Sequence, residues 1–211
     1  MPKLICFDMD GVIFEHKNFW LELHEALGTL EEGTKLTDKY LHSDYAKLVE
    51  EVVHKLWKGK DAAPYFQLIQ RIRYLPGVQE VLQHIKRQDY FTAIISSGPI
   101  DLARRAQHDL GIDFVYANEL VIENGKISGE FLWPVGGKDK KVQIVKHLCK
   151  DLGISPKEVI FVGDSDIDIL AFQFVGTSIA FNSHSKELSE VATHIIGGKD
   201  LRKVLPFLFQ K

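Results

Sequence analysis

Cysteine is scarce in this chain of 211 residues, which contains only Cys6 and Cys149. Two cysteines so far apart in the sequence form neither a disulfide framework nor the spacing of a metal site. We therefore expect two reduced thiols in the core of a cytosolic protein.

Long apolar runs, a charged-then-apolar leader and an excess of positive charge are missing as well. No apolar run approaches the roughly 18 residues that a membrane-spanning helix needs, and the N-terminus leads directly into a strand pattern. The 26 Lys and Arg face 29 Asp and Glu, so the net charge is −3. We expect a soluble, cytoplasmic protein that binds neither nucleic acid nor an anionic membrane.

Alternating strand and helix patterns are present over most of the chain. Short apolar runs predict strands at 3–7, 91–95, 114–117 and 159–164, and a hairpin that turns at Asn124-Gly125. Helical patterns lie between the strands, which predicts parallel pairing with helical crossovers.

The segment after the first strand carries helical patterns only. Its clearest stripe runs from Tyr45 to Trp57, where apolar residues recur every three or four positions. We expect an α/β fold with a Rossmann-like parallel sheet flanked by helices and a small all-helical cap inserted after the first strand. The expected division assigns residues 1–13 and 75–211 to the core and residues 14–74 to the cap.

Polar residues lie at or just beyond the carboxyl ends of three of the predicted strands. They are Asp8 and Asp10, Ser96 and Ser97, and Asp164 and Asp168. Ligands of an open parallel sheet bind at the carboxyl ends of its strands, so we expect these side chains to converge. Clustered carboxylates repel one another unless a hard cation joins them, and Mg²⁺ prefers oxygen ligands. The sequence therefore predicts a magnesium site at this edge of the sheet.

Such groups suit phosphoryl transfer. A carboxylate can attack phosphorus to form an aspartyl-phosphate, and a second acid two residues later can protonate the leaving oxygen and then activate water. A lysine and a serine hydroxyl, together with backbone N–H groups, can hold the phosphoryl oxygens. The segment "KDKK" offers Lys138, Lys140 and Lys141 for the lysine.

The joint order of these motifs resembles that of the haloacid dehalogenase superfamily of phosphatases. "DMDGV" resembles its first motif, "IISSG" its second and "GDSDID" its fourth, between residue 5 and about residue 180. The resemblance implies that Asp8 is the nucleophile and a Mg²⁺ ligand. It implies that Asp10 is the general acid/base and offers its backbone carbonyl to the metal.

The same resemblance implies roles for the later motifs. Ser96 would bind phosphate, Asp164 would ligate Mg²⁺, and Asp168 would support the metal shell or the lysine. Ser97 is either a further phosphate contact or a spacer, and Gly98 permits close backbone approach. Asp166 reads as a solvated acid in the first turn of a helix, with metal ligation as the alternative.

Resemblance extends to the phosphoserine phosphatase branch of this superfamily. Lys141 lies 23 residues before Asp164, a spacing that resembles this branch, so Lys141 is the predicted third-motif lysine. The helical insertion resembles the branch's small cap, and "ANELVIENGKISGE" resembles one of its hairpins. Arg71, six residues before Gly77, resembles the cap arginine that holds the substrate carboxylate.

One position departs from the branch. The phosphoserine phosphatase branch has a glutamate here that pairs with the ammonium of the substrate. This chain has Lys17 instead, and its positive charge would repel an amino group. Phosphoserine is therefore one candidate substrate among small phosphorylated metabolites.

We expect a Mg²⁺-dependent phosphomonoester hydrolase that acts through an aspartyl-phosphate and resembles phosphoserine phosphatase. The alternatives are a phosphatase of another small phosphorylated metabolite, a phosphotransferase to an alcohol, and a non-catalytic phospho-Asp signalling domain. A second acid at Asp10 and the cap argue against the signalling domain. A dehalogenase has no leaving oxygen to protonate, and so has little use for Asp10 or Mg²⁺.

Overall fold

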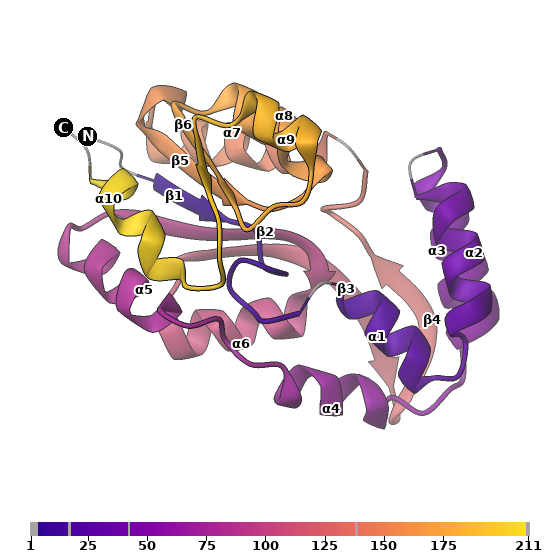
Figure 1. Ribbon diagram of the computed structural model, residues 1–211. Coiled ribbons are helices and arrows are strands. Elements are labelled where there is room, and N and C mark those ends of the chain that lie inside the picture. Colours follow the sequence, from indigo (N-terminus) through magenta and orange to yellow (C-terminus); the bar gives the residue numbers. More distant parts are fainter. Residues whose placement is uncertain (1–3, 17, 42, 138, 210–211) are drawn as a thin grey trace.

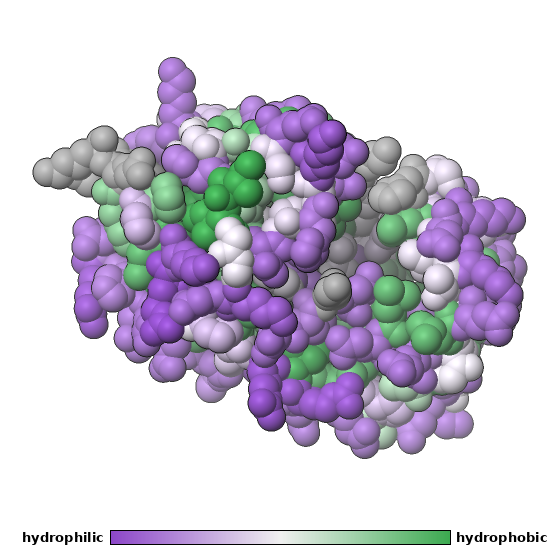
Figure 2. All heavy atoms as spheres, in the orientation of Figure 1, coloured by the Kyte–Doolittle hydropathy of each residue, from purple (hydrophilic) through white to green (hydrophobic). Residues whose placement is uncertain are grey.

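A computed structural model describes residues 4–16, 18–41, 43–137 and 139–209. Helices cover both faces of a twisted sheet, and further helices stand beside one of its edges (Figure 1). Polar residues dominate the visible surface, with apolar patches over the C-terminal strands and over the helices beside that edge (Figure 2). No helix in these ranges is long and apolar enough to cross a lipid bilayer.

The described strands form one sheet in the order β4-β3-β2-β1-β5-β6-β7. They are β1 (Leu4–Phe7), β2 (Phe91–Pro99), β3 (Phe114–Glu123), β4 (Lys126–Leu132), β5 (Val159–Gly163), β6 (Thr177–Phe181) and β7 (His194–Ile196). Every neighbouring pair is parallel except β3 and β4, which form the antiparallel hairpin. Asn124 and Gly125 turn the hairpin with positive φ angles of 50° and 77°, as an Asn-Gly turn prefers. The predicted α/β sheet is confirmed.

Two helical layers sandwich the sheet. One layer holds α5 (Val78–Arg87), α6 (Ile100–Leu110), η4 (Leu201–Val204) and α10 (Leu205–Leu208), and the other holds α7 (Lys140–Leu152), α8 (Ile169–Phe174) and α9 (Lys186–Val191). Ile5 and Phe7 of β1 pack in the first core, and Leu4 and Cys6 pack in the second. Because side chains alternate along a strand, an unbroken apolar run supplies both cores. Cys6 and its core neighbour Cys149 are buried free thiols, as predicted.

Between β1 and α5 the described residues form helices and loops without a strand. The helices are α1 (Phe19–Ala26), α2 (Leu30–Tyr40), α3 (Tyr45–Val49), the π-helix η1 (Glu50–Trp57) and α4 (Ala63–Arg71). We refer to residues 14–74 as the cap. The stripe from Tyr45 to Trp57 forms α3 and η1, whereas α2 has no counterpart among the predicted helices. The sequence of α2 has no apolar stripe that would predict a helix, and in the structure only Gly33 of α2 is buried.

The β3–β4 hairpin positions the cap. Figure 1 shows β3 and β4 extending from the sheet toward α1 and α2. The N–H of Gly59 donates to the carbonyl of Ile127 at 2.8 Å, and the N–H of Ile127 donates to the carbonyl of Lys60 at 3.0 Å. The ring of Trp20 in α1 lies 5.3 Å from that of Phe131 in β4. These contacts hold the cap over the carboxyl ends of the central strands.

Candidate active site

A buried lysine lies between two carboxylates at the carboxyl edge of the sheet. Nζ of Lys141, in the first turn of α7, lies 2.7 Å from Oδ2 of Asp8 and donates to Oδ1 of Asp168 at 2.6 Å. Asp8 follows β1, and Asp168 ends the short helix η3 (Asp166–Asp168) after β5. All three side chains are 5% exposed or less. Two carboxylates therefore share one ammonium, and all three groups are shielded from solvent.

The charges of this group shift one another's pKa values. Burial alone would lower the pKa of Lys141, but the negative charges of Asp168 and Asp8 outweigh it, so the pKa is raised and the ammonium stays protonated. Burial raises the pKa of Asp8 to about 6 against the opposing charge of Lys141. The pKa of Asp164 is raised to about 8, mainly by burial and in addition by the negative charges of Asp8 and Asp168.

The acidic side chains fit a divalent cation. Asp8, Asp164 and Asp168 each offer an oxygen, and these oxygens lie within 4.8 Å of one another. A single ammonium does not balance three neighbouring carboxylates, and the raised pKa of Asp164 is the expected consequence. Carboxylate oxygens are the ligands that hard divalent cations take.

The loop after β1 is shaped by backbone hydrogen bonds and a glycine. The carbonyl of Met9 accepts from the N–H groups of Ile13 and Phe14 at 2.9 and 3.1 Å, which closes a tight turn. Gly11 lies in this turn with φ of +73°, and a Cβ there would lie 2.5 Å from Oδ2 of Asp164. The glycine of "DMDGV" therefore allows the first and fourth motifs to approach each other.

Asp10 lies where the core loop meets the cap. Its Oδ2 accepts from the N–H of Phe19 at 3.2 Å, at the start of α1. Its Oδ1 faces Nε2 of His16 at 3.1 Å, a distance that makes an ion pair when the ring is protonated. Burial would lower the pKa of His16, but contact with Asp10 and the charge of Glu22 raise it overall. The side chain of Asp10 is 18% exposed, so it remains open to the cavity above Asp8.

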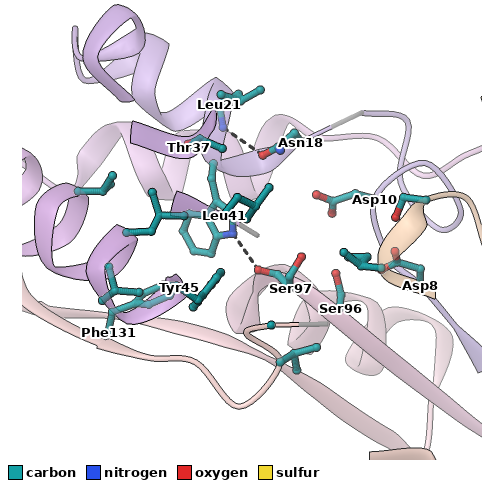
Figure 3. A pocket seen from close by; sticks show the side chains of 18 of the residues that line it. Asp8, Asp10, Asn18, Leu21, Thr37, Leu41, Tyr45, Ser96, Ser97 and Phe131 are labelled. Atoms are coloured by element: carbon teal, nitrogen blue, oxygen red, sulfur yellow. Dashed lines mark hydrogen bonds between the residues drawn. The ribbon is translucent and has the colours of Figure 1, made fainter. Parts of the chain in front are cut away.

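Residues 96–98 lie at the end of β2, where its pairing with β3 is irregular between Ile95 and Pro99, and we refer to them as the β2 loop. Ser96 and Ser97 of this loop face the two aspartates across the cavity. Ser96, Ser97, Asp8 and Asp10 point toward a common space in Figure 3. Oγ of Ser96 is buried and accepts from the N–H of Gly98 at 3.1 Å. A Cβ at Gly98 would lie 2.5 Å from the Met9 side chain, so this loop approaches the β1 loop as closely as a glycine permits.

Not every residue predicted from the sequence joins this group. Asp166 lines the cavity and accepts a hydrogen bond from Ser185, outside the acidic cluster. Arg71 is 73% exposed and lies 3.7 Å from Glu22, away from the cavity wall. Lys140 is exposed, in contrast to its neighbour Lys141. Predictions for Lys17 and Lys138 concern positions outside the described residues.

Asn118 is a site residue that the sequence reasoning missed. It is fully buried in β3, where its Nδ2 donates to the carbonyl of Ser97 at 3.0 Å and to the hydroxyl of Tyr45 at 3.2 Å. Its Oδ1 accepts from the N–H of Val135 at 3.0 Å. Asn118 thereby joins the β2 loop, the cap and the loop before α7. The available signal was one amide directly after the predicted strand at 114–117.

No role in the chemistry was predicted for His16 or Ser183. His16 follows the β1 loop and faces Asp10, and Oγ of Ser183 donates to the carbonyl of Asp164 at 2.5 Å. Neither residue belongs to a motif with a distinctive spacing: His16 follows Asp10 by six residues, and Ser183 follows Asp164 by 19.

Known proteins match this chain over most of its length. The profile of the haloacid dehalogenase-like hydrolases matches residues 2–176. A phosphoserine phosphatase of Archaeoglobus fulgidus is 32% identical over 94% of this chain and 58% of the relative, so the chain spans just over half of that protein. A phosphoserine phosphatase of Wolinella succinogenes is 30% identical over 98% of this chain and 100% of the relative. A solved phospho-aspartyl intermediate analogue of phosphoserine phosphatase superposes with a TM-score of 0.86 at 28% identity, over 99% of both chains.

Proposed function

Because this chain belongs to the haloacid dehalogenase-like hydrolases, on their phosphoserine phosphatase branch, we propose that it hydrolyses phosphomonoesters through phosphorylation of Asp8. The observation that carries this proposal is the contact between buried Asp8 and Lys141, with Asp10 two residues later at the same cavity. The chain is accordingly a phosphoric monoester hydrolase.

Asp8 is the proposed nucleophile. A carboxylate oxygen of Asp8 attacks phosphorus, a new O–P bond forms, and the bond from phosphorus to the alcohol oxygen breaks. Lys141 supports this step because its charge opposes the effect of burial on the pKa of Asp8 and favours the ionised carboxylate. Asp168 holds the ammonium of Lys141 in place through the hydrogen bond at 2.6 Å.

Asp10 is the proposed proton carrier. It gives a proton to the departing alcohol oxygen and later takes one from the water that attacks the phosphorylated Asp8. The water oxygen then bonds to phosphorus, the bond between phosphorus and Asp8 breaks, and inorganic phosphate leaves. The hydrogen bond from Phe19 and the contact with His16 orient the carboxylate of Asp10 for both steps.

The phosphoryl oxygens are held by groups of the β2 loop and α7. We assign this role to the hydroxyl of Ser96, the backbone of Ser97 and Gly98, and the ammonium of Lys141. The carbonyl of Ser97 accepts from Nε1 of Trp20 at 2.8 Å and from Asn118 at 3.0 Å, which fixes the loop. Donors fixed before the reaction stabilise developing charge without reorganisation.

We assign the divalent cation to Mg²⁺. Asp8 and Asp164 would hold it with the backbone carbonyl of Asp10, and Asp168 would support this set. When bound, the ion supplies charge neutralisation for the phosphoryl group and for the carboxylates.

The proposal is tested by the release of inorganic phosphate. Purified protein with Mg²⁺ is offered a panel of phosphomonoesters that includes O-phospho-L-serine, the substrate in the names of the matched relatives. We expect turnover of at least one ester and none in Asp8→Asn. Turnover by the Asp8→Asn protein at the wild-type rate would remove the proposed nucleophile.

A further inference from the structure

The cavity above Asp8 extends into the cap, and its cap side is apolar. The cavity measures about 360 Å³, which is at the small end of the range for ligand pockets. The cap, together with Phe131 and Val135, lines it mainly with apolar side chains: Trp20, Leu21, Leu41, Tyr45, Leu48, Val49, Val52, Val53 and Trp57. In Figure 3, Leu21, Leu41, Tyr45 and Phe131 lie on the side opposite Asp8 and Asp10.

The polar residues of this wall carry no charge at neutral pH. Among the described cap residues that line the cavity they are Asn18, His24 and Thr37. His24 is 2% exposed, its Nδ1 lies 2.8 Å from the hydroxyl of Thr29, and its ring packs 4.6 Å from Trp57. Burial lowers the pKa of His24 to about 4, so the ring is neutral.

Arg71 and Glu22 of the cap are paired with each other and do not line the cavity. Arg71 is exposed at the end of α4, and its Nη2 lies 3.7 Å from Oε2 of Glu22. Glu22 also lies 3.6 Å from Nδ1 of His16, whose other nitrogen faces Asp10. Among the described residues, no carboxylate, ammonium or guanidinium of the cap lines the cavity to pair with an ammonium or a carboxylate of a ligand.

A zwitterionic alcohol does not suit such a wall. Its ammonium and carboxylate would lose water without gaining partners of opposite charge, which is costly in an apolar environment. An uncharged apolar alcohol gains from the same surface, because its own apolar area leaves water there. Among the described residues, the side chains with acidic groups or an ammonium that line the cavity all belong to the core: Asp8, Asp10, Lys141, Asp164 and Asp166.

We infer that the preferred substrate is the phosphate monoester of an uncharged alcohol with an apolar, aromatic side group. This inference rests on the proposed phosphatase function and specifies the substrate class of the same site. The phosphate lies at the β2 loop, and the side group lies against Trp20, Tyr45 and Phe131. Trp20 is held for this contact, since its Nε1 donates to the carbonyl of Ser97 and its ring packs 5.3 Å from Phe131.

Three esters of primary alcohols test the inference by kcat/KM: 2-phenylethyl phosphate, ethyl phosphate and O-phospho-L-serine. Their leaving groups are all primary alkoxides, so differences report mainly on recognition of the side group. We expect 2-phenylethyl phosphate to exceed ethyl phosphate by about 10-fold or more, as apolar contact in a pocket provides. We expect phosphoserine to fall below 2-phenylethyl phosphate by at least the same factor. Phosphoserine equal to or above 2-phenylethyl phosphate overturns the inference.

Val49→Arg tests the position of the apolar wall. Val49 is half-buried and lines the cavity, so a guanidinium there should lower the kcat/KM ratio of 2-phenylethyl to ethyl phosphate by about 10-fold. Val191→Arg is the matched control, because Val191 is half-buried at the end of α9, outside the cavity lining. A ratio that is unchanged in Val49→Arg, or that falls equally in both variants, contradicts the inference. A general loss of folded protein would lower both rates and leave the ratio unchanged.

A binding measurement tests the apolar pocket independently of the proposed phosphatase activity. 3-Phenylpropylphosphonate and propylphosphonate differ only in the ring and are not hydrolysed, so calorimetry measures recognition without turnover. We expect the ring to tighten binding by about 10-fold or more. If none of the three esters is hydrolysed but the ring tightens binding, the proposed function fails and the apolar pocket stands. If the two phosphonates bind equally, the inference fails whether or not an ester is hydrolysed.

Discussion

Lys141 illustrates how one side chain links the stability and the chemistry of the site. Its ammonium separates Asp8 from Asp168, and all three groups are buried. Removing it in Lys141→Met would leave two carboxylates buried without their cation. We expect a loss of about 3–5 kcal/mol in the free energy of unfolding, and phosphate release reduced by about 1,000-fold or more.

Urea unfolding and phosphate release measure these two effects. Lys140→Met is the matched control, because Lys140 is the exposed neighbour on the same turn of α7. The role of Lys141 is contradicted if its variant is as stable and as active as the Lys140 variant.

His16 is expected to position the proton carrier. Its ring nitrogen lies 3.1 Å from Oδ1 of Asp10, and its side chain is 3% exposed. In His16→Ala, Asp10 should lose its fixed orientation, so turnover of alkyl phosphates should fall by about 10-fold or more. Nitrophenyl phosphate should be affected less, because its leaving oxygen needs less help from an acid.

Comparing kcat for ethyl phosphate and nitrophenyl phosphate in His16→Ala measures this difference. His108→Ala is the control, since His108 is 90% exposed and lies on α6. Equal losses for the two esters would assign His16 a structural role only.

Sequence motifs located some site residues better than others. Asp8, Asp10, Ser96 and Asp164 follow predicted strands, and strand ends converge in a parallel sheet, so their meeting was predictable. His16 and Asn118 act through partners that the fold brings to them, at 3.1 Å from Asp10 and 3.0 Å from the Ser97 carbonyl. His16 lies only six residues after Asp10 but belongs to no recognisable motif, and the contact of Asn118 joins residues that are 21 positions apart.

At the scale of elements, the cap is less predictable than the sheet. Strands that are buried on both faces have continuous apolar sequences, and the β3–β4 turn carries Asn124-Gly125. The exposed helix α2 buries only Gly33, and its side-chain pair Lys35 and Glu31 lies on the surface. Its formation depends on packing beside α1, where a Cβ at Gly33 would lie 2.2 Å from the ring of His24.

The packing of α1 against α2 and η1 should make the cap sensitive to acid. Burial lowers the pKa of His24 to about 4, below its ordinary value of 6.5. A group with a lowered pKa in the folded state binds protons more readily when unfolded, so stability falls as pH drops from about 6.5 toward 4. Between pH 7 and pH 5 we expect His24 to remove roughly 1–2 kcal/mol.

The free energy of unfolding in urea, measured at both pH values, tests this expectation. The effect of His24 is the pH dependence of the wild type minus that of His24→Gln, which cancels the contributions of the other titrating groups. His108→Gln serves as the exposed control. An identical pH dependence in the wild type and His24→Gln would show that His24 does not resist protonation.

For the whole molecule, the acidic cluster joins distant parts of the chain. Asp8 follows β1, and Asp164 and Asp168 follow β5, so a bound cation links two central strands. We expect chelator to abolish turnover and Mg²⁺ to restore it. Mg²⁺ should also raise the Tm of the wild type by mass action.

Turnover and Tm are read in chelator and then with increasing Mg²⁺. Asp164→Asn should show a much smaller rise in Tm, because it loses one carboxylate of the cluster. Full activity in chelator, or an equal Tm response in Asp164→Asn, would contradict the assignment of the metal site.

The central claim is that Asp8 carries the phosphoryl group during turnover. The most direct test is mass spectrometry of protein quenched in acid within the first turnovers of an active phosphomonoester. We predict a phosphoryl adduct on the peptide that contains Asp8 in the wild type, and none in Asp8→Asn. An adduct on another residue, or turnover by Asp8→Asn, would contradict the claim.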